Sequence, residues 1–300
     1  MKKIHLLLFI LFASIVDNGF AQLNPSPSQF YFNKLQQNVA ASGFDKGLRV
    51  DASYRNFAPN GFAGSPVNIY FGAQSSVGER SGVGLQFQSE NAGLLSRSRM
   101  MGSYAIDFGN EDLHTRIGVG IGFMFARINQ SSPLFRGDAN DPFIAQFNAK
   151  QLKLDGSIGI QIESANGWSF MASSPSVGSI QQFSGYEAID YVLLTSTVSK
   201  KITLSGEEDD QIAITPLLGY QLMQGVDGVF QSGVLLDYRN WVKFMGMYYS
   251  NSEYSAGVSI PVKNKLALNF MYNSGKIYGK GLLNVGGTME AHIMYRLGGN

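Results

Sequence analysis

The chain has 300 residues, of which 15% are charged and 12% are aromatic, and it contains 35 glycines and no cysteine. The lack of cysteine excludes a disulfide framework, a thiolate metal site and a lipoprotein anchor. Once the predicted signal peptide described below is removed, basic and acidic residues are equal in number, so charge gives no reason to expect nucleic-acid binding.

The N-terminus has the pattern of a secretory signal peptide. Lys2 and Lys3 give it a basic start, residues 4–16 are apolar, and residues 19–21 form a small-x-small cleavage site. No later window approaches the roughly 18 uninterrupted apolar residues of a membrane-spanning helix. We therefore predict an exported protein with a signal peptide at residues 1–21.

Alternation of apolar and polar residues dominates the chain from residue 47 onward, and it is longest at residues 113–125. One face of that stretch is aliphatic and aromatic, while the other carries His114, Arg116 and three glycines. Strands of soluble domains usually end after about 5–6 residues, whereas a tilted strand needs about 9–11 to cross a bilayer. The pattern predicts a transmembrane β-strand with a lipid-facing side and a side facing a lumen.

We count about fourteen such strands. An even number is typical of a single-chain outer-membrane barrel. The predicted strands are residues 48–55, 67–74, 83–88, 97–108, 113–125, 150–163, 167–174, 188–200, 211–223, 228–238, 241–250, 254–260, 265–273 and 286–297.

The connections alternate in length. If the first strand runs outward, long connections fall outside the cell and short ones in the periplasm, as in bacterial barrels. We therefore predict an all-β fold: a transmembrane antiparallel β-barrel of about 14 strands, at residues 47–300, in the cell outer membrane. The outer connections include residues 58–65, 89–96, 129–149, 175–187 and 274–285, and the inner ones 75–81, 109–112, 164–166 and 261–264.

Residues 22–46, between the signal peptide and the first strand, do not alternate. They contain two prolines, an amide-rich run, and a single large apolar block that includes Phe30 and Phe32. This segment could be a periplasmic arm or could fold back into the lumen as a plug.

Aromatic residues near the strand ends are interpreted as girdle residues at the membrane interfaces. They are Tyr54, Phe57, Tyr70, Trp168, Trp241 and Tyr295.

Catalytic and metal-binding chemistry has little support in the sequence. After signal removal only His114 and His292 remain, each on the polar side of a predicted strand and neither next to a nucleophilic serine. Two isolated histidines do not make a metal site. The acidic run at 207–210 lacks the ligand spacing of a calcium loop and is interpreted as a solvated hairpin tip, and residues 138–142 as a turn. We predict no catalytic residue, no metal and no cofactor.

Several segments occur in the order found in one family. Residues 27–33 read PSQFYFN, residues 38–43 read NVAASG, and residues 287–297 read GTMEAHIMYRL. These are similar to an opening S-Q-Y/F-x-F-N, a following N-P-A-x-A-G with valine for the proline, and a closing G-S-H-E-x-x-L-x-Y-x-F with methionine for the histidine. On these motifs the chain resembles the PorP/SprF family of outer-membrane proteins, which is associated with type IX secretion and gliding in Bacteroidota.

The resemblance implies a non-enzymatic barrel that binds or anchors a secreted cargo protein with a C-terminal sorting domain and contacts periplasmic components of the machinery. We predict Phe135 and Phe143 of the long outer connection, and Phe30 and Phe32 of the N-terminal segment, as partner-binding residues. Both loop phenylalanines could equally pack the loop against the barrel. The alternatives are a FadL-like or porin-type transport channel and an outer-membrane hydrolase.

Overall fold

The structure is a computed structural model. It describes residues 31–298 except 45–46, 58–64, 133, 139, 150–151, 178–191, 207–210, 224–225, 263–264 and 275–286. The predicted signal peptide and Phe30 lie outside the described residues. No helix in the described part of the chain is long and apolar enough to cross a membrane.

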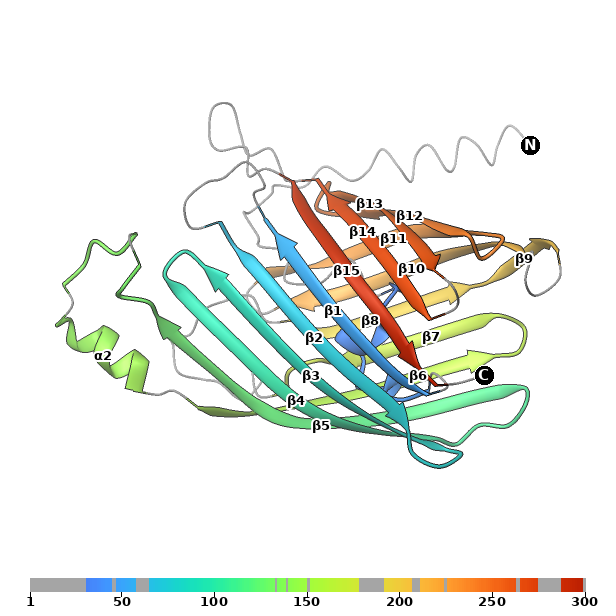
Figure 1. The fold of residues 1–300 in the computed structure, drawn as a ribbon, viewed down its shortest axis with the longest axis horizontal. Coiled ribbons are helices and arrows are strands. Elements are labelled where there is room, and N and C mark those ends of the chain that lie inside the picture. Colours follow the sequence, from blue (N-terminus) through green and yellow to red (C-terminus); the bar gives the residue numbers. More distant parts are fainter. Residues whose placement is uncertain are drawn as a thin grey trace.

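The strands form one closed antiparallel barrel (Figure 1). Neighbours in sequence are neighbours in space, the last strand pairs with the first so that Leu48 lies opposite Leu297, and a β10–β11 pairing completes the ring. The predicted all-β barrel is therefore confirmed. The strands are β1 (Leu48–Asn56), β2 (Val67–Ser76), β3 (Ser81–Ala92), β4 (Leu95–Asp107), β5 (Leu113–Ile128), β6 (Lys153–Ser164), β7 (Trp168–Ser174), β8 (Val192–Lys200), β9 (Ile202–Ser205), β10 (Ile212–Met223), β11 (Val226–Tyr238), β12 (Val242–Tyr249), β13 (Tyr254–Val262), β14 (Leu266–Asn273) and β15 (Thr288–Leu297).

The predicted count of fourteen is kept because β8 and β9 occupy one place in the ring. Both pair with β10, on either side of a break at Lys201. Pro216 of β10 lies at this break, between the register pairs formed by Leu217 and Ile214. Proline has no amide hydrogen to donate to a neighbouring strand, which accounts for the interruption.

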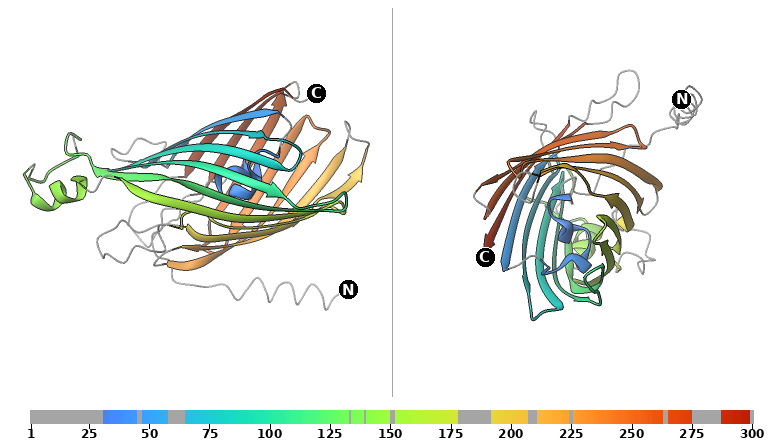
Figure 2. Two further views of the ribbon diagram at one scale, coloured as in Figure 1. Left: turned by 90° about the horizontal axis from the view of Figure 1, so that it is seen from below. Right: turned by 90° about the vertical axis from the view of Figure 1, so that its right-hand side faces the viewer.

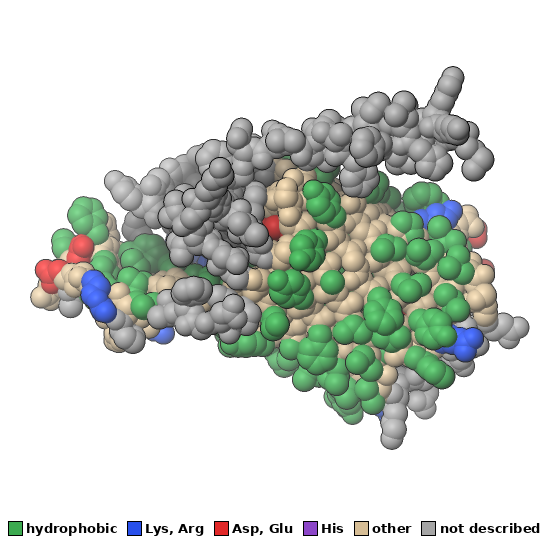
Figure 3. Space-filling model, turned by 90° about the horizontal axis from the view of Figure 1, so that it is seen from above, with side chains coloured by type: hydrophobic (Ala, Val, Ile, Leu, Met, Phe, Trp, Pro, Cys, Tyr) green, Lys and Arg blue, Asp and Glu red, His purple; other side chains and the backbone are tan. Residues whose placement is uncertain are grey.

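Apolar side chains cover the outside of the barrel, and polar ones fill the inside. On β5, Ile121 is 69% exposed on the outer face. On the inner face of β1 and β15, Asp51 and His292 are 0% and 1% exposed. On the side of the barrel drawn in Figure 3, apolar side chains are spread over the outer surface, and most of the visible charged side chains lie toward its two ends. The outer face thus has the apolar band that lipid requires.

One predicted outer connection is wrong. Residues 89–96 do not form a loop, because β3 and β4 continue to a tight turn at Gly93 and Leu94. Gly93 has φ 61°, a conformation that glycine adopts without strain. Beside the turn, Arg97 and Glu90 lie opposite each other and form an ion pair. The two strands therefore continue as a polar hairpin beyond the part of the barrel whose outer face is apolar.

The predicted girdle is only partly right. Tyr54, Trp168, Trp241 and Tyr295 are exposed on the outer surface, as expected. Phe57 and Tyr70 are instead buried, Phe57 under the Arg55 guanidinium at 4.3 Å and Tyr70 over Gly72. Each lies on the polar face of its strand, and strand periodicity outweighs the preference of an aromatic ring for the interface.

The connection between β5 and β6 extends well beyond the other described parts of the barrel (Figure 1) and contains the helix α2 (Pro142–Ala149). Asp141 accepts a hydrogen bond from the Phe143 amide at 2.8 Å, and Asp138 accepts one from the Asn140 amide at 2.9 Å. These contacts confirm the predicted turn at residues 138–142 and give α2 an acidic N-cap followed by proline.

Candidate functional site

The N-terminal segment lies inside the ring of strands (Figure 2). We call residues 31–44 the plug; it contains two short 3-10 helices, η2 (Lys34–Gln36) and η3 (Val39–Ala41). Leu35, Val39 and Ala40 are at most 2% exposed. η3 contacts β4, β5 and β6, so the plug lies against one side of the lumen. Of the two arrangements left open by the sequence, the described residues adopt the lumenal one.

Inward-facing glycines provide the space that the plug occupies. A Cβ atom at Gly118 would lie 2.5 Å from the backbone of Val39 and Ala40, one at Gly82 1.9 Å from the Ser42 carbonyl oxygen, and one at Gly159 2.0 Å from Asn38 Oδ1. Real Cβ atoms do not approach this closely, so these positions require glycine for plug contact. Gly118 of β5, Gly82 of β3 and Gly159 of β6 therefore leave the space into which the plug fits.

Polar groups of the plug are hydrogen-bonded to the wall. The Asn38 amide nitrogen donates to the Ile160 carbonyl at 2.9 Å, and its oxygen caps η3 by accepting from the Ala40 amide at 2.9 Å. The Ser173 hydroxyl donates to the Gln37 carbonyl at 2.5 Å. The Gly43 amide donates to Gln74 Oε1 at 2.9 Å. Bonds to β2, β6 and β7 thus fix the plug in position at several separate points.

A chain of ion pairs joins the plug to the start of β5 and the end of β6. Lys34 Nζ lies 2.7 Å from Glu163, which also accepts from Arg116 at 2.8 Å. Arg116 lies 3.3 Å from Asp107, whose carboxylate is 2.9 Å from His114 Nδ1. His114 is therefore part of a charged network at the lumen mouth.

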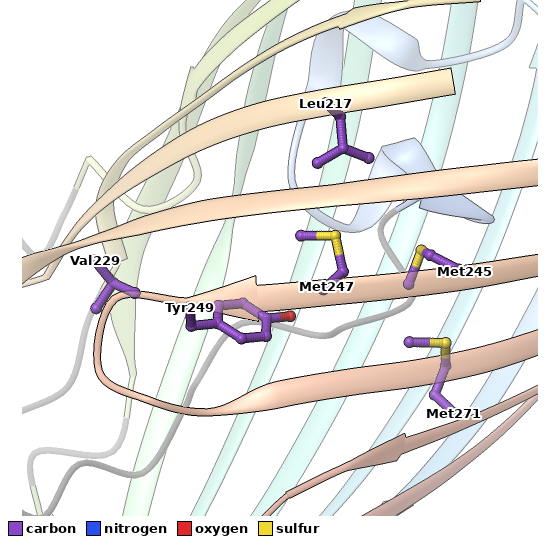
Figure 4. Close-up of a cluster of buried hydrophobic side chains, with 6 residues drawn as sticks. All are labelled: Leu217, Val229, Met245, Met247, Tyr249 and Met271. Atoms are coloured by element: carbon purple, nitrogen blue, oxygen red, sulfur yellow. The ribbon is translucent and has the colours of Figure 1, made fainter. Parts of the chain in front are cut away.

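The opposite wall of the lumen is apolar. Leu217, Val229, Met245, Met247, Tyr249 and Met271, from β10, β11, β12 and β14, form a buried cluster (Figure 4). Tyr31 and Phe32 of the plug pack against this cluster. The Phe32 carbonyl also accepts a hydrogen bond from Arg49 Nη2 at 2.5 Å. Methionine side chains are flexible and fill irregular gaps, so the methionines of this lumenal cluster can pack around the two aromatic rings of the plug.

His292 and His114 do not come together. His292 Nε2 lies 3.0 Å from Asp51 Oδ1, and its Nδ1 lies 2.5 Å from the Asn269 amide nitrogen. Asp51 is also held by Arg49 at 2.9 Å. Both ring nitrogens of His292 are thus engaged by Asp51 and Asn269. Among the described residues, no three histidine or acidic side chains group as metal ligands would.

The predicted partner-binding residues differ in their surroundings. Phe143 stands on α2 with 74% of its surface exposed, whereas Phe135 is half-buried with its ring against Gly137. Phe32 lies inside the barrel on the lumenal cluster. The four residues predicted as partner-binding therefore do not form one surface.

Comparison with known proteins identifies the family. The model of the type IX secretion system membrane protein PorP/SprF matches residues 19–295. The chain belongs to the PorP/SprF family. This membership, together with the barrel, places it in the outer membrane as a component of a secretion system. The family is one of secretion-system membrane proteins and not of enzymes.

Solved outer-membrane barrels share the fold of this PorP/SprF chain. The toluene transporter TbuX of Ralstonia pickettii is 11% identical, with a TM-score of 0.54, over 93% of this chain and 96% of that one. The CymD monoaromatic hydrocarbon channel is 10% identical, with a TM-score of 0.50, over 93% and 95% of the two chains. At these identities the likeness concerns the fold alone. No curated protein matches the chain.

Sequence reasoning missed most of the plug contacts. The lumenal cluster lies on strands whose inner face was expected to be polar, and its methionines are spread over separate strands. The feature of the sequence that pointed to these contacts is the row of glycines on β5. That row is compatible with a plug and equally with an open lumen.

Proposed function

We propose that this PorP/SprF barrel binds or anchors a secreted cargo protein at the cell surface and contacts periplasmic components of the type IX machinery. Cargo with a C-terminal sorting domain is the partner that the family resemblance implies. The observation that carries the proposal is Phe143, an exposed aromatic ring on a capped helix held clear of the barrel. Exposed aromatic anchors of this kind are common at the centres of protein interfaces.

The attachment of α2 supports this role. Asn148 Oδ1 accepts from the Ile128 amide at 2.7 Å, and its amide nitrogen donates to the Ile128 carbonyl at 3.1 Å. The pairing of β5 with β6 ends at Met124, and the two bonds from Asn148 take its place at Ile128. They also fix the helix to a transmembrane strand. A docking element on a rigid support loses less entropy on binding than a free loop does.

Contact with periplasmic components is proposed for the N-terminal segment, for which Phe30 and Phe32 are the predicted residues. Phe30 lies outside the described residues. Phe32 packs against the lumenal cluster, so in this arrangement its role is to hold the plug.

Deletion of residues 134–147 tests the surface role. We expect the barrel to insert normally and the cargo to be lost from the cell surface, measured by surface proteomics of whole cells. Phe143→Ala should reproduce part of this loss, and Gln146→Ala, an exposed change on the same helix, should not. Normal cargo display by the deletion strain would contradict the proposal.

The second candidate is a FadL-like or porin-type channel. It is favoured by the apolar lumenal cluster, since an apolar wall suits the passage of apolar molecules, and by a fold shared with TbuX and CymD. Substantial single-channel conductance of the purified wild-type protein, or uptake of an aromatic hydrocarbon, would favour this candidate over anchoring.

A further inference from the structure

The short strand β9 lies at the end of the barrel opposite α2 (Figure 1). Two short turns are found at this end. The β6–β7 turn, residues 165–167, bonds to Lys201 at the start of β9, and the β11–β12 turn, residues 239–241, bonds to Gln211 at the start of β10. Short turns face the periplasm in bacterial barrels, so β9 is assigned to the periplasmic side.

β9 has a neighbouring strand along one edge only. On that edge it pairs with β10. On the other edge the wall ends where β9 begins, because Trp168, the first residue of β7, lies opposite Lys200, and the Lys201 amide donates to the Gly167 carbonyl at 2.8 Å. No strand in the described part of the chain pairs with β9 on this side. The outer edge of β9 therefore presents backbone N–H and C=O groups that the barrel does not use.

This open edge requires β9 to lie in water. Backbone groups without a partner are not tolerated in hydrocarbon, so an open sheet edge lies outside the membrane. Just before β9, the Lys200 ammonium lies 4.8 Å from the centre of the Trp168 ring, and both residue types are common at the membrane interface. All four residues of β9 are exposed, whereas alternate residues of β14 are buried on the lumen side. β9 therefore extends past the interface with neither face covered.

Exposed apolar side chains accompany the open edge. Ile202 is 41% exposed and Leu204 60% exposed. Exposure of this kind is ordinary on the lipid-facing part of the barrel, but in water it is unfavourable. Proteins commonly protect an edge strand by placing charged residues on it, and the sequence of β9, Ile-Thr-Leu-Ser, carries no charge. Its β-branched residues also favour the extended conformation. These properties favour the addition of another strand.

We propose that β9 is a docking edge, to which an extended segment of a periplasmic protein adds as an antiparallel strand. The antiparallel direction is preferred because its ladder is the more stable one. The segment has apolar side chains at alternate positions, which pack beside Ile202 and Leu204. It has an acidic residue near its C-terminal end, which the antiparallel direction places beside the exposed Lys201. In this mode of binding the main-chain bonds supply affinity and the alternate side chains supply specificity.

The inference rests on the proposed contact with periplasmic components of the type IX machinery, and it gives that contact a surface. Phe32, which the sequence suggested for this contact, packs inside the barrel. The docking edge is instead accessible from outside the lumen. Because β9 and α2 lie at opposite ends of the barrel, a periplasmic segment on β9 and a cargo protein on α2 can be bound at the same time.

The test uses the full chain in lipid nanodiscs and three labelled peptides: acetyl-Thr-Val-Thr-Val-Glu-amide, the same peptide N-methylated at its three inner residues, and a version with lysine in place of the glutamate. Fluorescence anisotropy measures binding, and hydrogen exchange reports on the amides of residues 202–205. We expect saturable binding of the first peptide with slower exchange at β9. The methylated peptide should bind about tenfold more weakly, since it loses ladder hydrogen bonds and keeps its side chains. The lysine peptide should also bind more weakly, because it meets Lys201.

Two variants locate the docking edge. Leu204→Lys places a charge on it and should weaken binding of the glutamate peptide about tenfold. Val77→Lys is the matched control, because Val77 is 52% exposed at the same end of the barrel but lies in the β2–β3 turn. Lys201→Glu should reverse the preference, so that the lysine peptide binds better than the glutamate peptide. A general loss of folding would not produce this reversal.

The proposal is overturned if the wild-type protein binds none of the peptides, if it binds the methylated and unmethylated peptides equally, or if Leu204→Lys and Val77→Lys have equal effects. It is also overturned if residues 202–205 are protected without peptide and lose that protection on dilution in detergent, because the edge then pairs with a second copy of this chain. The comparison of the peptides needs only the wild-type protein, so it is decisive even if a variant fails to fold. Cargo display on cells is measured separately, so a failure of the docking edge is distinguishable from a failure of cargo anchoring.

Discussion

Gly118 of β5 leaves the space that the carbonyl group of Val39 occupies in the plug, since a Cβ at position 118 would lie 2.5 Å from that oxygen. The glycine is therefore a packing requirement between two segments that are far apart in the sequence. The same holds for Gly82 and Gly159, which meet Ser42 and Asn38. The plug and the wall fit one another closely at these glycines, where there is no room for an added side chain.

Gly118→Val should displace the plug and destabilise the barrel by about 1–3 kcal/mol, because overpacking forces the backbone to move. The readout is the temperature at which the folded form disappears on an unheated gel, together with maleimide labelling of an Ala40→Cys reporter. Ala40 is fully buried, and the chain has no other cysteine. Gly246→Val is the control, because a Cβ at Gly246 has nothing within 4 Å; equal effects of the two changes would refute the packing argument.

Asp51→Asn should weaken the barrel markedly. Asp51 is fully buried and holds both Arg49 and His292, so the change leaves buried cationic and imidazole groups without their carboxylate. Removal of one partner of a buried pair costs about 3–5 kcal/mol. Asp237→Asn breaks the more accessible pair with Lys243, so its effect on the urea midpoint of unfolding should be much smaller. A similar midpoint for the two variants would contradict the expected difference.

Double replacement of Tyr31 and Phe32 by alanine should loosen the plug. The two rings make its contact with the lumenal cluster, and their removal exposes apolar surface to the lumen. We expect a higher single-channel conductance in planar bilayers than the wild-type protein has, with little change in insertion. Phe143→Ala removes an aromatic ring outside the lumen and should leave the conductance unchanged. An unaltered conductance in the double variant would show that the rings do not hold the plug.

Asn148→Ala should release the C-terminal end of α2 from β5. The side chain makes two hydrogen bonds to the backbone of Ile128, each worth about 0.5–1.5 kcal/mol. Hydrogen exchange should become faster at the Ile128 amide and in α2, while β1 and β15 stay protected. Asp141→Ala, which removes the N-cap, should speed exchange at the first turn of α2 instead. Unchanged protection of Ile128 in Asn148→Ala would show that α2 is held by other contacts.

The strand pattern could be predicted from the sequence because it depends on local periodicity. Alternation along β5 and its neighbours predicted the barrel and its approximate number of strands. The boundaries were least secure where polar alternation continued past the apolar band, as at Glu90 and Arg97. Phe57 and Tyr70 are buried because each takes a position of the two-residue alternation that points inward. This position outweighs the preference of an aromatic side chain for the membrane interface.

The candidate site could not be predicted in the same way, because its parts lie far apart in the chain. Lys34 meets Glu163, and Gly118 meets Val39, only after the sheet has closed and the plug has entered the lumen. The sequence by itself determined which strands alternate and so have one face toward lipid and one toward the lumen, since a period of two residues separates the two sets of side chains. The tertiary structure decided what fills that lumen, since steric fit between non-local segments selects one arrangement of the plug among those that the sequence allows.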